Sequence, residues 1–183
     1  MNQSSRNQET LQSPQASRRA AFTLIEILVV VAILGILASI VVPQMAGATQ
    51  TSRESMLKDE LRFLRSQIAL FKSQHRDTPP GYPGGDRTAS PTEVDFVAQL
   101  TTYTNENCDT NSSQSGLFRF GPYLSVIPEN PLNRSATVLV TPTGAPLPAP
   151  AVDGHGWIYR PETQEIIANS VGTDPSGTPY SLY

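Results

Sequence analysis

Cysteine is almost absent from this sequence, because Cys108 is the only one among 183 residues. A lone cysteine cannot form a disulfide within the chain, so a small scaffold held together by disulfides is excluded. A reactive nucleophile is one interpretation of Cys108. Because it lies in a stretch rich in Asn and Ser, we interpret it instead as a bystander in a polar loop.

Histidine is also scarce. His75 and His155 are the only two, and neither has a second histidine or a cysteine at the spacing of a zinc site, so we expect both on the surface. The sequence also lacks a glycine-rich phosphate loop and the ordered Ser, His and Asp residues of a catalytic triad. It therefore predicts a protein that is not an enzyme; an anchored enzyme whose catalytic residues converge only in three dimensions is the alternative.

Basic residues are too few for a nucleic-acid-binding protein. The chain has 13 Lys and Arg against 16 Asp and Glu, a net charge of -3. Residues 1–21 contain three of the basic residues and one of the acidic ones, which leaves a net charge of -5 on residues 22–183. Binding to phosphates requires clustered Lys and Arg, so we expect no nucleic-acid partner.

One long apolar run dominates what is present. Residues 22–42 contain a single charged side chain, and as a helix they would extend about 31 Å, enough to cross the hydrocarbon core of a membrane. Arg18 and Arg19 lie just before the run. The positive-inside tendency then places the residues before the run in the cytoplasm and the rest of the chain outside.

The single charge in this run is Glu26, near its beginning. A carboxylate there opposes membrane insertion unless a partner neutralises it. The small residues Ala20 and Ala21 precede the run, whereas the small-residue cleavage site of an ordinary secretory signal follows its apolar region. The order of basic residues, small residues and apolar helix therefore differs from that of a secretory signal.

These residues resemble a known family. Ala-Phe-Thr-Leu-Ile-Glu at 21–26, followed by an unbroken apolar helix, is similar to the amino terminus of type IV prepilins and type II secretion pseudopilins. The resemblance implies that a prepilin peptidase cuts between Ala21 and Phe22 and methylates the new amine of Phe22. The family usually has Gly before the cut, so Ala21 is a departure from its pattern.

The resemblance also implies roles in filament assembly. Glu26 would neutralise the amine of an adjacent subunit, and Gly35 and Pro43 match positions at which family helices loosen in the filament. Both residue types are unfavourable inside a helix. The plain alternative is a membrane anchor in which Glu26 lies at the interface and has no assembly role.

Beyond Pro43 the pattern becomes amphipathic and predicts that the helix continues to about His75. Apolar residues recur at steps of 4, 3, 4 and 3, as in a helix with one buried face: Leu57, Leu61, Leu64, Ile68 and Phe71. We expect Met56, Phe63 and Leu70 to widen this stripe. The stripe could form a coiled-coil seam, but its mixture of Leu, Ile and Phe favours packing against a sheet.

The remaining elements are short. Ser90-Pro91-Thr92-Glu93 predicts a capping box and a helix to about Thr102, with Val94 on its apolar face, and a polar loop follows at 104–116. Residues 137–141, 156–160 and 165–168 are expected to be strands, the last two forming a hairpin closed by residues 161–164. Residues 142–153 are rich in Pro and Ala and predict an extended surface loop.

Together these patterns and the resemblance predict an α+β protein with a pilin-like fold. The long amino-terminal helix would pack on a small antiparallel β-sheet, with one short extra helix. We expect three regions: a cytoplasmic leader at 1–21, a transmembrane and assembly half of the helix at 22–43, and an extracytoplasmic domain at 44–183.

The soluble region also resembles the major pseudopilin of type II secretion, in the order of its Pro, Gly and Trp motifs. Many type IV pilins have a carboxy-terminal cysteine pair, and its absence here favours the pseudopilin branch. Major pseudopilins bind calcium in the carboxy-terminal loop, where this chain has Asp174 and Ser176. The second family carboxylate is missing, so calcium would bind weakly, and we favour a solvent-exposed turn without a metal.

The resemblance therefore predicts a structural subunit of a periplasmic pseudopilus, held in the bacterial inner membrane before assembly. Its implied partners are further copies of itself, the prepilin peptidase, minor pseudopilins and an inner-membrane secretion platform, with a separate ATPase as energy source. Two alternatives stay open. One is a type IV pilin of a surface fibre for adhesion, motility or DNA uptake, and the other is a membrane-tethered domain that does not polymerise.

Overall fold

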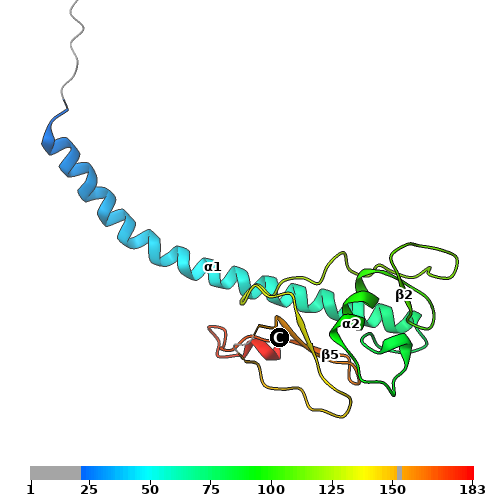
Figure 1. Cartoon of the computed structure of the whole chain (residues 1–183). Helices are drawn as coiled ribbons and strands as arrows, with labels where there is room; N and C mark the ends of the chain where they lie inside the picture. Colours follow the sequence, from blue (N-terminus) through cyan, green and yellow to red (C-terminus); the bar gives the residue numbers. More distant parts are fainter. Residues whose placement is uncertain (1–21, 152–153) are drawn as a thin grey trace, which may run out of the picture. The chain divides into compact units, whose positions relative to one another are not determined.

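The structure is a computed structural model that describes residues 22–151 and 154–183, with the backbone alone at 42–46. The chain divides into two units, Met1–Met45 and Ala46–Tyr183. One element, the 51-residue helix α1 (Leu24–Gln74), belongs to both (Figure 1). The predicted long helix is therefore confirmed, with each end within about two residues of the prediction.

In the first unit, α1 exposes its apolar side chains. The stretch Leu24–Val41 has a mean hydropathy of 3.0 and is long and apolar enough to cross a membrane. Its large apolar side chains are exposed along the whole stretch. Gly35 and Pro43 both lie within the continuous helix.

In the second unit, the remainder of α1 supplies one side of the hydrophobic core. The predicted stripe is buried, each side chain at most 1% exposed: Leu57, Leu61, Leu64, Ile68 and Phe71. The same core contains Trp157, Tyr159 and Ile166 from the sheet, so packing on a sheet is confirmed. The prediction that Met56, Phe63 and Leu70 widen the stripe is wrong. They are 52%, 47% and 44% exposed because the rest of the unit covers one face of the helix, and they lie on another.

Three strands form the sheet that packs on α1. The order is β3 (Val138–Val140), β4 (Trp157–Arg160) and β5 (Glu165–Ala168). β4 and β5 form the predicted hairpin, with Trp157 opposite Ala168. β3 and β4 are parallel, so the sheet is mixed rather than wholly antiparallel as predicted. The connection between them is long enough for the crossover that parallel strands need, and the Pro-rich residues 142–153 are part of it.

The short helix α2 (Glu93–Thr101) is capped two residues later than predicted. Thr92, not Ser90, is the N-cap, and its Oγ1 accepts a hydrogen bond from the Asp95 N–H. Phe96 is buried, whereas Val94 is 77% exposed, so the prediction of a buried Val94 is wrong. The three-residue spacing from Thr92 to Asp95 identifies the cap, since the N-cap side chain bonds to the N–H three residues on.

The predicted polar loop at 104–116 contains further structure. Strands β1 (Tyr103–Thr104) and β2 (Thr110–Asn111) pair antiparallel. Cys108 lies in the loop between them, as expected, but its side chain is buried and only 2% exposed. Two short 3-10 turns complete the elements: η1 (Pro83–Gly85) and η2 (Tyr180–Leu182).

His75 is buried rather than on the surface as predicted. Its ring stacks on Phe71 with 3.9 Å between centroids, and its Nε2 lies 2.9 Å from Thr104 Oγ1. A histidine can be buried in this way when both ring nitrogens have partners, and its Nδ1 lies 2.7 Å from the Phe71 carbonyl oxygen. His155 is half-buried. The α+β class is confirmed, and the arrangement is consistent with a pilin-like fold.

Candidate functional site

The first turn of α1 is closed by a reciprocal pair of side chains. Glu26 Oε2 accepts hydrogen bonds from the Thr23 N–H at 2.8 Å and from the Thr23 hydroxyl at 2.9 Å. Thr23 Oγ1 accepts a bond from the Glu26 N–H at 3.3 Å. This is a capping box, which satisfies backbone groups that a helix start leaves free. The sequence analysis missed the role of Thr23, although the Thr-x-x-Glu spacing indicates it.

The capping box leaves half of the Glu26 carboxylate open. Oε2 accepts both bonds from Thr23, and within the described part of the chain Oε1 has no hydrogen-bond partner. The carboxylate lies at the amino end of α1, where the helix dipole favours negative charge. Glu26 can therefore keep its cap and still accept a donor from outside the chain.

The other predicted residues of this segment differ in what surrounds them. Ala21 lies outside the described residues, and the side chain of Phe22 is exposed. Gly35 lies on the open surface of α1, where an added Cβ would contact nothing within 4 Å. Pro43 is within the helical backbone. No close contact in the first unit requires a residue without a Cβ at position 35. The effect of Gly35 is therefore on the stability of the helix itself.

The carboxy-terminal loop brings Asp174 and Ser176 together, the two residues considered for calcium. Asp174 Oδ1 accepts hydrogen bonds from the Ser176 N–H at 2.8 Å, the Ser176 hydroxyl at 2.6 Å and the Thr178 N–H at 2.9 Å. Asp174 Oδ2 accepts one from the Tyr183 hydroxyl at 2.9 Å. The bonds from Ser176 and Thr178 are the main reason that the pKa of Asp174 is lowered to about 2.

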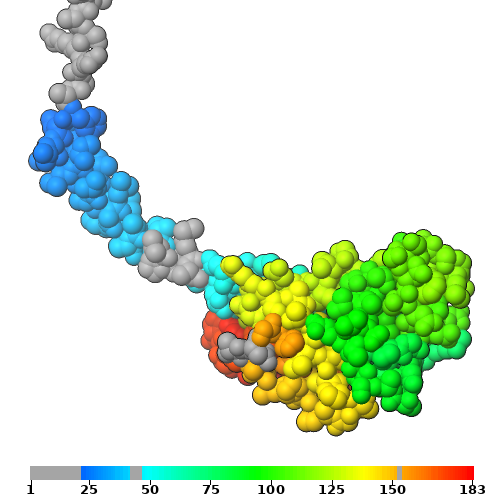
Figure 2. Space-filling model, in the orientation of Figure 1, coloured from blue at the N-terminus to red at the C-terminus, as the bar shows by residue number. Residues whose placement is uncertain are grey.

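Two tyrosines connect this loop to α1. The Tyr180 hydroxyl donates to Glu54 Oε1 at 3.0 Å, and Gln50 Nε2 donates to the Tyr180 oxygen at 3.0 Å. Lys58 Nζ lies 4.1 Å from the centre of the Tyr183 ring, a distance suited to a cation–π contact. Figure 2 shows the carboxy-terminal segment in red beside α1 in cyan. The sequence analysis did not predict this contact.

Arg65 makes the third connection between α1 and this segment. Its Nη2 donates to the main-chain oxygens of Ile166 at 3.0 Å and Tyr183 at 2.5 Å. Partial burial lowers the pKa of Arg65. An arginine remains charged at neutral pH even so, and these bonds to a charged donor tie β5 and the last residue to the helix.

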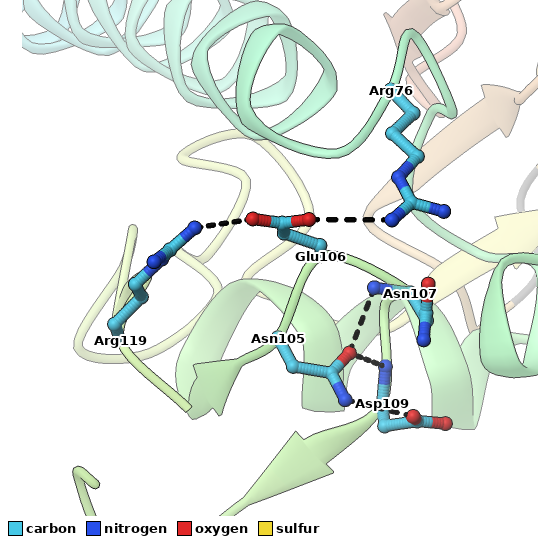
Figure 3. Close-up of polar contacts among 6 residues, drawn as sticks. All are labelled: Arg76, Asn105, Glu106, Asn107, Asp109 and Arg119. Carbon is cyan, nitrogen blue, oxygen red and sulfur yellow. Dashed lines mark hydrogen bonds and ion pairs between the residues drawn. The ribbon is translucent and has the colours of Figure 1, made fainter. Parts of the chain in front are cut away.

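A second polar cluster orders the loop beyond the end of α1 (Figure 3). Glu106 pairs with Arg76 at 3.3 Å and also with Arg119. Asn105 Oδ1 accepts hydrogen bonds from the N–H groups of Asn107 and Asp109, which folds the loop into a tight turn. Exposed ion pairs of this kind contribute little stability, so we interpret the cluster as ordering the loop around buried Cys108.

The surroundings of Cys108 disfavour the reactive form of its thiol. Burial, with a smaller effect of Asp109, raises the pKa of the Cys108 thiol to about 11, so the nucleophilic thiolate is scarce at neutral pH. Among residues 22–151 and 154–183, no group of three or more His, Cys, Asp or Glu side chains is arranged to hold a metal.

Comparison with known proteins identifies the amino-terminal segment. Residues 16–42 match the prokaryotic N-terminal methylation motif. The chain is also similar to the type II secretion system core protein G of Aeromonas hydrophila, with 26% identity over 117 residues, or 64% of this chain and 70% of the relative. No solved structure matches the chain.

Two further relatives are similar over a shorter length. The type II secretion system core protein G of Pseudomonas aeruginosa is 38% identical over 58 residues, or 32% of this chain and 41% of the relative. That of Dickeya chrysanthemi is 37% identical over 62 residues, or 34% of this chain and 40% of the relative. This chain thus has a prepilin-type methylation motif on an exposed apolar helix, and it is a homologue of type II secretion system core protein G.

Proposed function

We propose that this protein is a pseudopilin, a structural subunit that polymerises into a periplasmic pseudopilus for type II protein secretion. The observation that supports this most directly is the methylation motif at 16–42 in a homologue of type II secretion system core protein G. The motif overlaps the exposed apolar stretch Leu24–Val41, and an apolar surface of this length requires a membrane or other helices to cover it.

Processing would begin with cleavage between Ala21 and Phe22 by a prepilin peptidase, which would then methylate the Phe22 amine. The methylated amine stays cationic. In a staggered arrangement of helices it would approach Glu26 of an adjacent subunit, where Oε1 is open to a donor. Pairing the two charges offsets the cost of removing each from water, a cost of several kcal/mol for an unpaired ion.

Before assembly, the subunit would lie in the bacterial inner membrane with residues 1–21 in the cytoplasm. The domain at 44–183 would lie in the periplasm. Arg18 and Arg19 support this orientation, because basic residues favour the cytoplasmic side. Its partners would be the peptidase, further copies of the chain, minor pseudopilins and the secretion platform.

The helix would loosen between Gly35 and Pro43 when subunits pack into the filament. This segment is helical in the isolated chain. Compared with Ala, a helix interior is disfavoured by about 1 kcal/mol at Gly and about 3 kcal/mol at Pro. The helix is therefore weakened at both ends of this segment. The protein would have no catalytic role, and a separate ATPase would supply the energy.

The test is the substitution Glu26→Gln in the full chain, expressed in a host that has the secretion system. We expect the variant to insert into membranes and to be cleaved, but to lose the ladder of multimers seen after chemical cross-linking. Glu60→Gln, a second carboxylate of α1, is the matched control and should keep the ladder. A Glu26→Gln variant with a normal ladder would contradict the role of Glu26 in assembly and support a tethered domain that does not polymerise.

A further inference from the structure

The carboxy-terminal loop does not fit the calcium ion that its resemblance to major pseudopilins implies. Calcium takes six to eight oxygen ligands, usually with more than one carboxylate. In the structure, Asp174 supplies the only carboxylate of the loop at 172–179. The described residues provide no group of three or more acidic, histidine or cysteine side chains around it.

The groups around Asp174 point hydrogen-bond donors, not oxygen lone pairs, at its carboxylate. Three of its four hydrogen bonds come from Ser176 and Thr178 and one from Tyr183. Two of the donors are backbone N–H groups, which cannot ligate a cation. The Ser176 hydroxyl, which could have been a ligand, donates a hydrogen bond to Asp174 Oδ1 at 2.6 Å. A cation at Asp174 would therefore meet N–H groups where it needs oxygen lone pairs.

The backbone closes the same loop without any ion. The Asp174 N–H donates to the Thr178 carbonyl at 2.9 Å, and the Gly177 N–H donates to the Asp174 carbonyl at 2.9 Å. Thr173 and Pro179 form an isolated antiparallel bridge. The positive φ of 86° at Gly177 is a conformation that glycine adopts without strain, and it permits this tight turn.

We propose that Asp174 closes the carboxy-terminal loop without a metal, and that the Tyr183 hydroxyl takes the place of an ion by linking the loop to α1. Tyr183 is suited to this because it contacts both the carboxy-terminal loop and α1. Its hydroxyl donates to Asp174, its ring lies over Lys58, and its main-chain oxygen accepts from Arg65. Lys58 and Arg65 both belong to α1.

The first experiment compares the melting temperature of the full chain in detergent micelles with millimolar CaCl2 and with EGTA. The fluorescence of Trp157 is a suitable signal, because this single tryptophan is fully buried. We expect the same melting temperature in both solutions. Terbium(III) alone is a second probe, since a lanthanide bound at Asp174 would lie beside the Tyr183 phenol and be sensitised by it. We expect no sensitised emission.

Two substitutions test the closure itself. Tyr183→Phe removes one hydroxyl, and Asp174→Ala removes the acceptor of all four bonds. We expect each to lower the melting temperature, Tyr183→Phe by about 2–5 °C, and equally in CaCl2 and EGTA. Asp86→Ala is the matched control for the carboxylate, because Asp86 accepts from the N–H and hydroxyl of Thr88 in a similar short turn. Tyr103→Phe is the control for the tyrosine.

Three results would overturn the proposal. One is a saturable rise in melting temperature with CaCl2, absent with MgCl2 and lost in Asp174→Ala. Another is terbium emission that Tyr183→Phe removes. The third is a melting temperature of Tyr183→Phe equal to that of Tyr103→Phe and the unsubstituted chain. If Asp174→Ala does not fold, a saturable rise specific to CaCl2 in the unsubstituted chain and the loss of terbium emission in Tyr183→Phe still decide the question.

Discussion

Thr23 and Glu26 hold each other at the start of α1. The Glu26 carboxylate accepts from the Thr23 N–H and hydroxyl, and Thr23 Oγ1 accepts from the Glu26 N–H. The carboxylate that the proposed filament uses between subunits is therefore held in place within its own chain, while Oε1 is left open. Holding a charged group in one position lowers the entropy lost when it pairs with a neighbour.

The capping box predicts a local effect of Thr23→Val, which keeps the side-chain shape and removes the hydroxyl. Loss of such a cap costs about 1 kcal/mol. We expect the Glu26 amide, which bonds to Thr23 Oγ1, to exchange its hydrogen about 5-fold faster in micelles. Thr23→Ser keeps the hydroxyl and should exchange at the original rate. Equal exchange rates in Thr23→Val and Thr23→Ser would show that the hydroxyl does not cap the helix.

The buried stripe of α1 predicts effects of very different size at two neighbouring positions. Leu64 is fully buried and Phe63 is 47% exposed. Leu64→Ala should lower the free energy of unfolding by about 2–5 kcal/mol, because it leaves a cavity in the core. Phe63→Ala should change it by less than about 1 kcal/mol. Urea unfolding followed by Trp157 fluorescence measures both. A larger loss for Phe63→Ala than for Leu64→Ala would contradict the placement of the core.

The burial of His75 predicts that the folded protein loses stability in mild acid. The Phe71 carbonyl can only accept, so His75 Nδ1 carries the proton and Nε2 accepts from the Thr104 hydroxyl. Burial lowers the pKa of His75 below the ordinary value of a histidine side chain. The unfolded state therefore binds the proton more readily, and stability is complete above about pH 6.5 and falls as the pH is lowered toward the folded pKa.

The measurement is the melting temperature of the full chain between neutral pH and about pH 5. Arg76, Glu106 and Asp109 line the same cavity as His75. His75→Gln should flatten the pH dependence. If His75→Gln and the unsubstituted chain lose stability equally, the loss does not arise from His75.

The burial and raised pKa of the Cys108 thiol predict slow alkylation in the folded protein. Its pKa is raised from 9.0 to about 11, so at pH 8 the folded chain holds roughly 100-fold less thiolate than an unperturbed thiol. Burial of the sulfur slows the reaction further. We expect iodoacetamide to modify Cys108 at least about 100-fold faster in denaturing urea than in the folded protein. Comparable rates in the two conditions would show that the thiol is accessible and its pKa ordinary.

The long helix and the hairpin could be predicted from the sequence because their signals are local. The stripe from Leu57 to Phe71 repeats with the period of one helix, and the strands at 157–160 and 165–168 are joined by four residues. The parallel pairing of β3 could not be predicted in this way, because its partner lies beyond the connection at 141–156. Strand patterns indicate which residues pair only when the connection is short.

The contacts between the carboxy-terminal segment and α1 could not be predicted from the sequence for the same reason. Tyr180 meets Glu54 across 126 positions and Gln50 across 130, and no periodic pattern connects such positions. The lack of a zinc-site partner near His75 in the sequence indicates a surface histidine, but that spacing carries no information on burial. The Phe71 carbonyl and the Thr104 hydroxyl that permit its burial come from different segments of the chain.

The most direct test of the central claim is the intact mass and amino-terminal peptide map of the protein from membranes of its own host. A pseudopilin processed at the methylation motif is predicted to begin at Phe22 and to have a methylated amino terminus. A chain that keeps residues 1–21, or one that is cut after Val42, would contradict the account. The first result would support an uncleaved anchor, and the second a secreted domain.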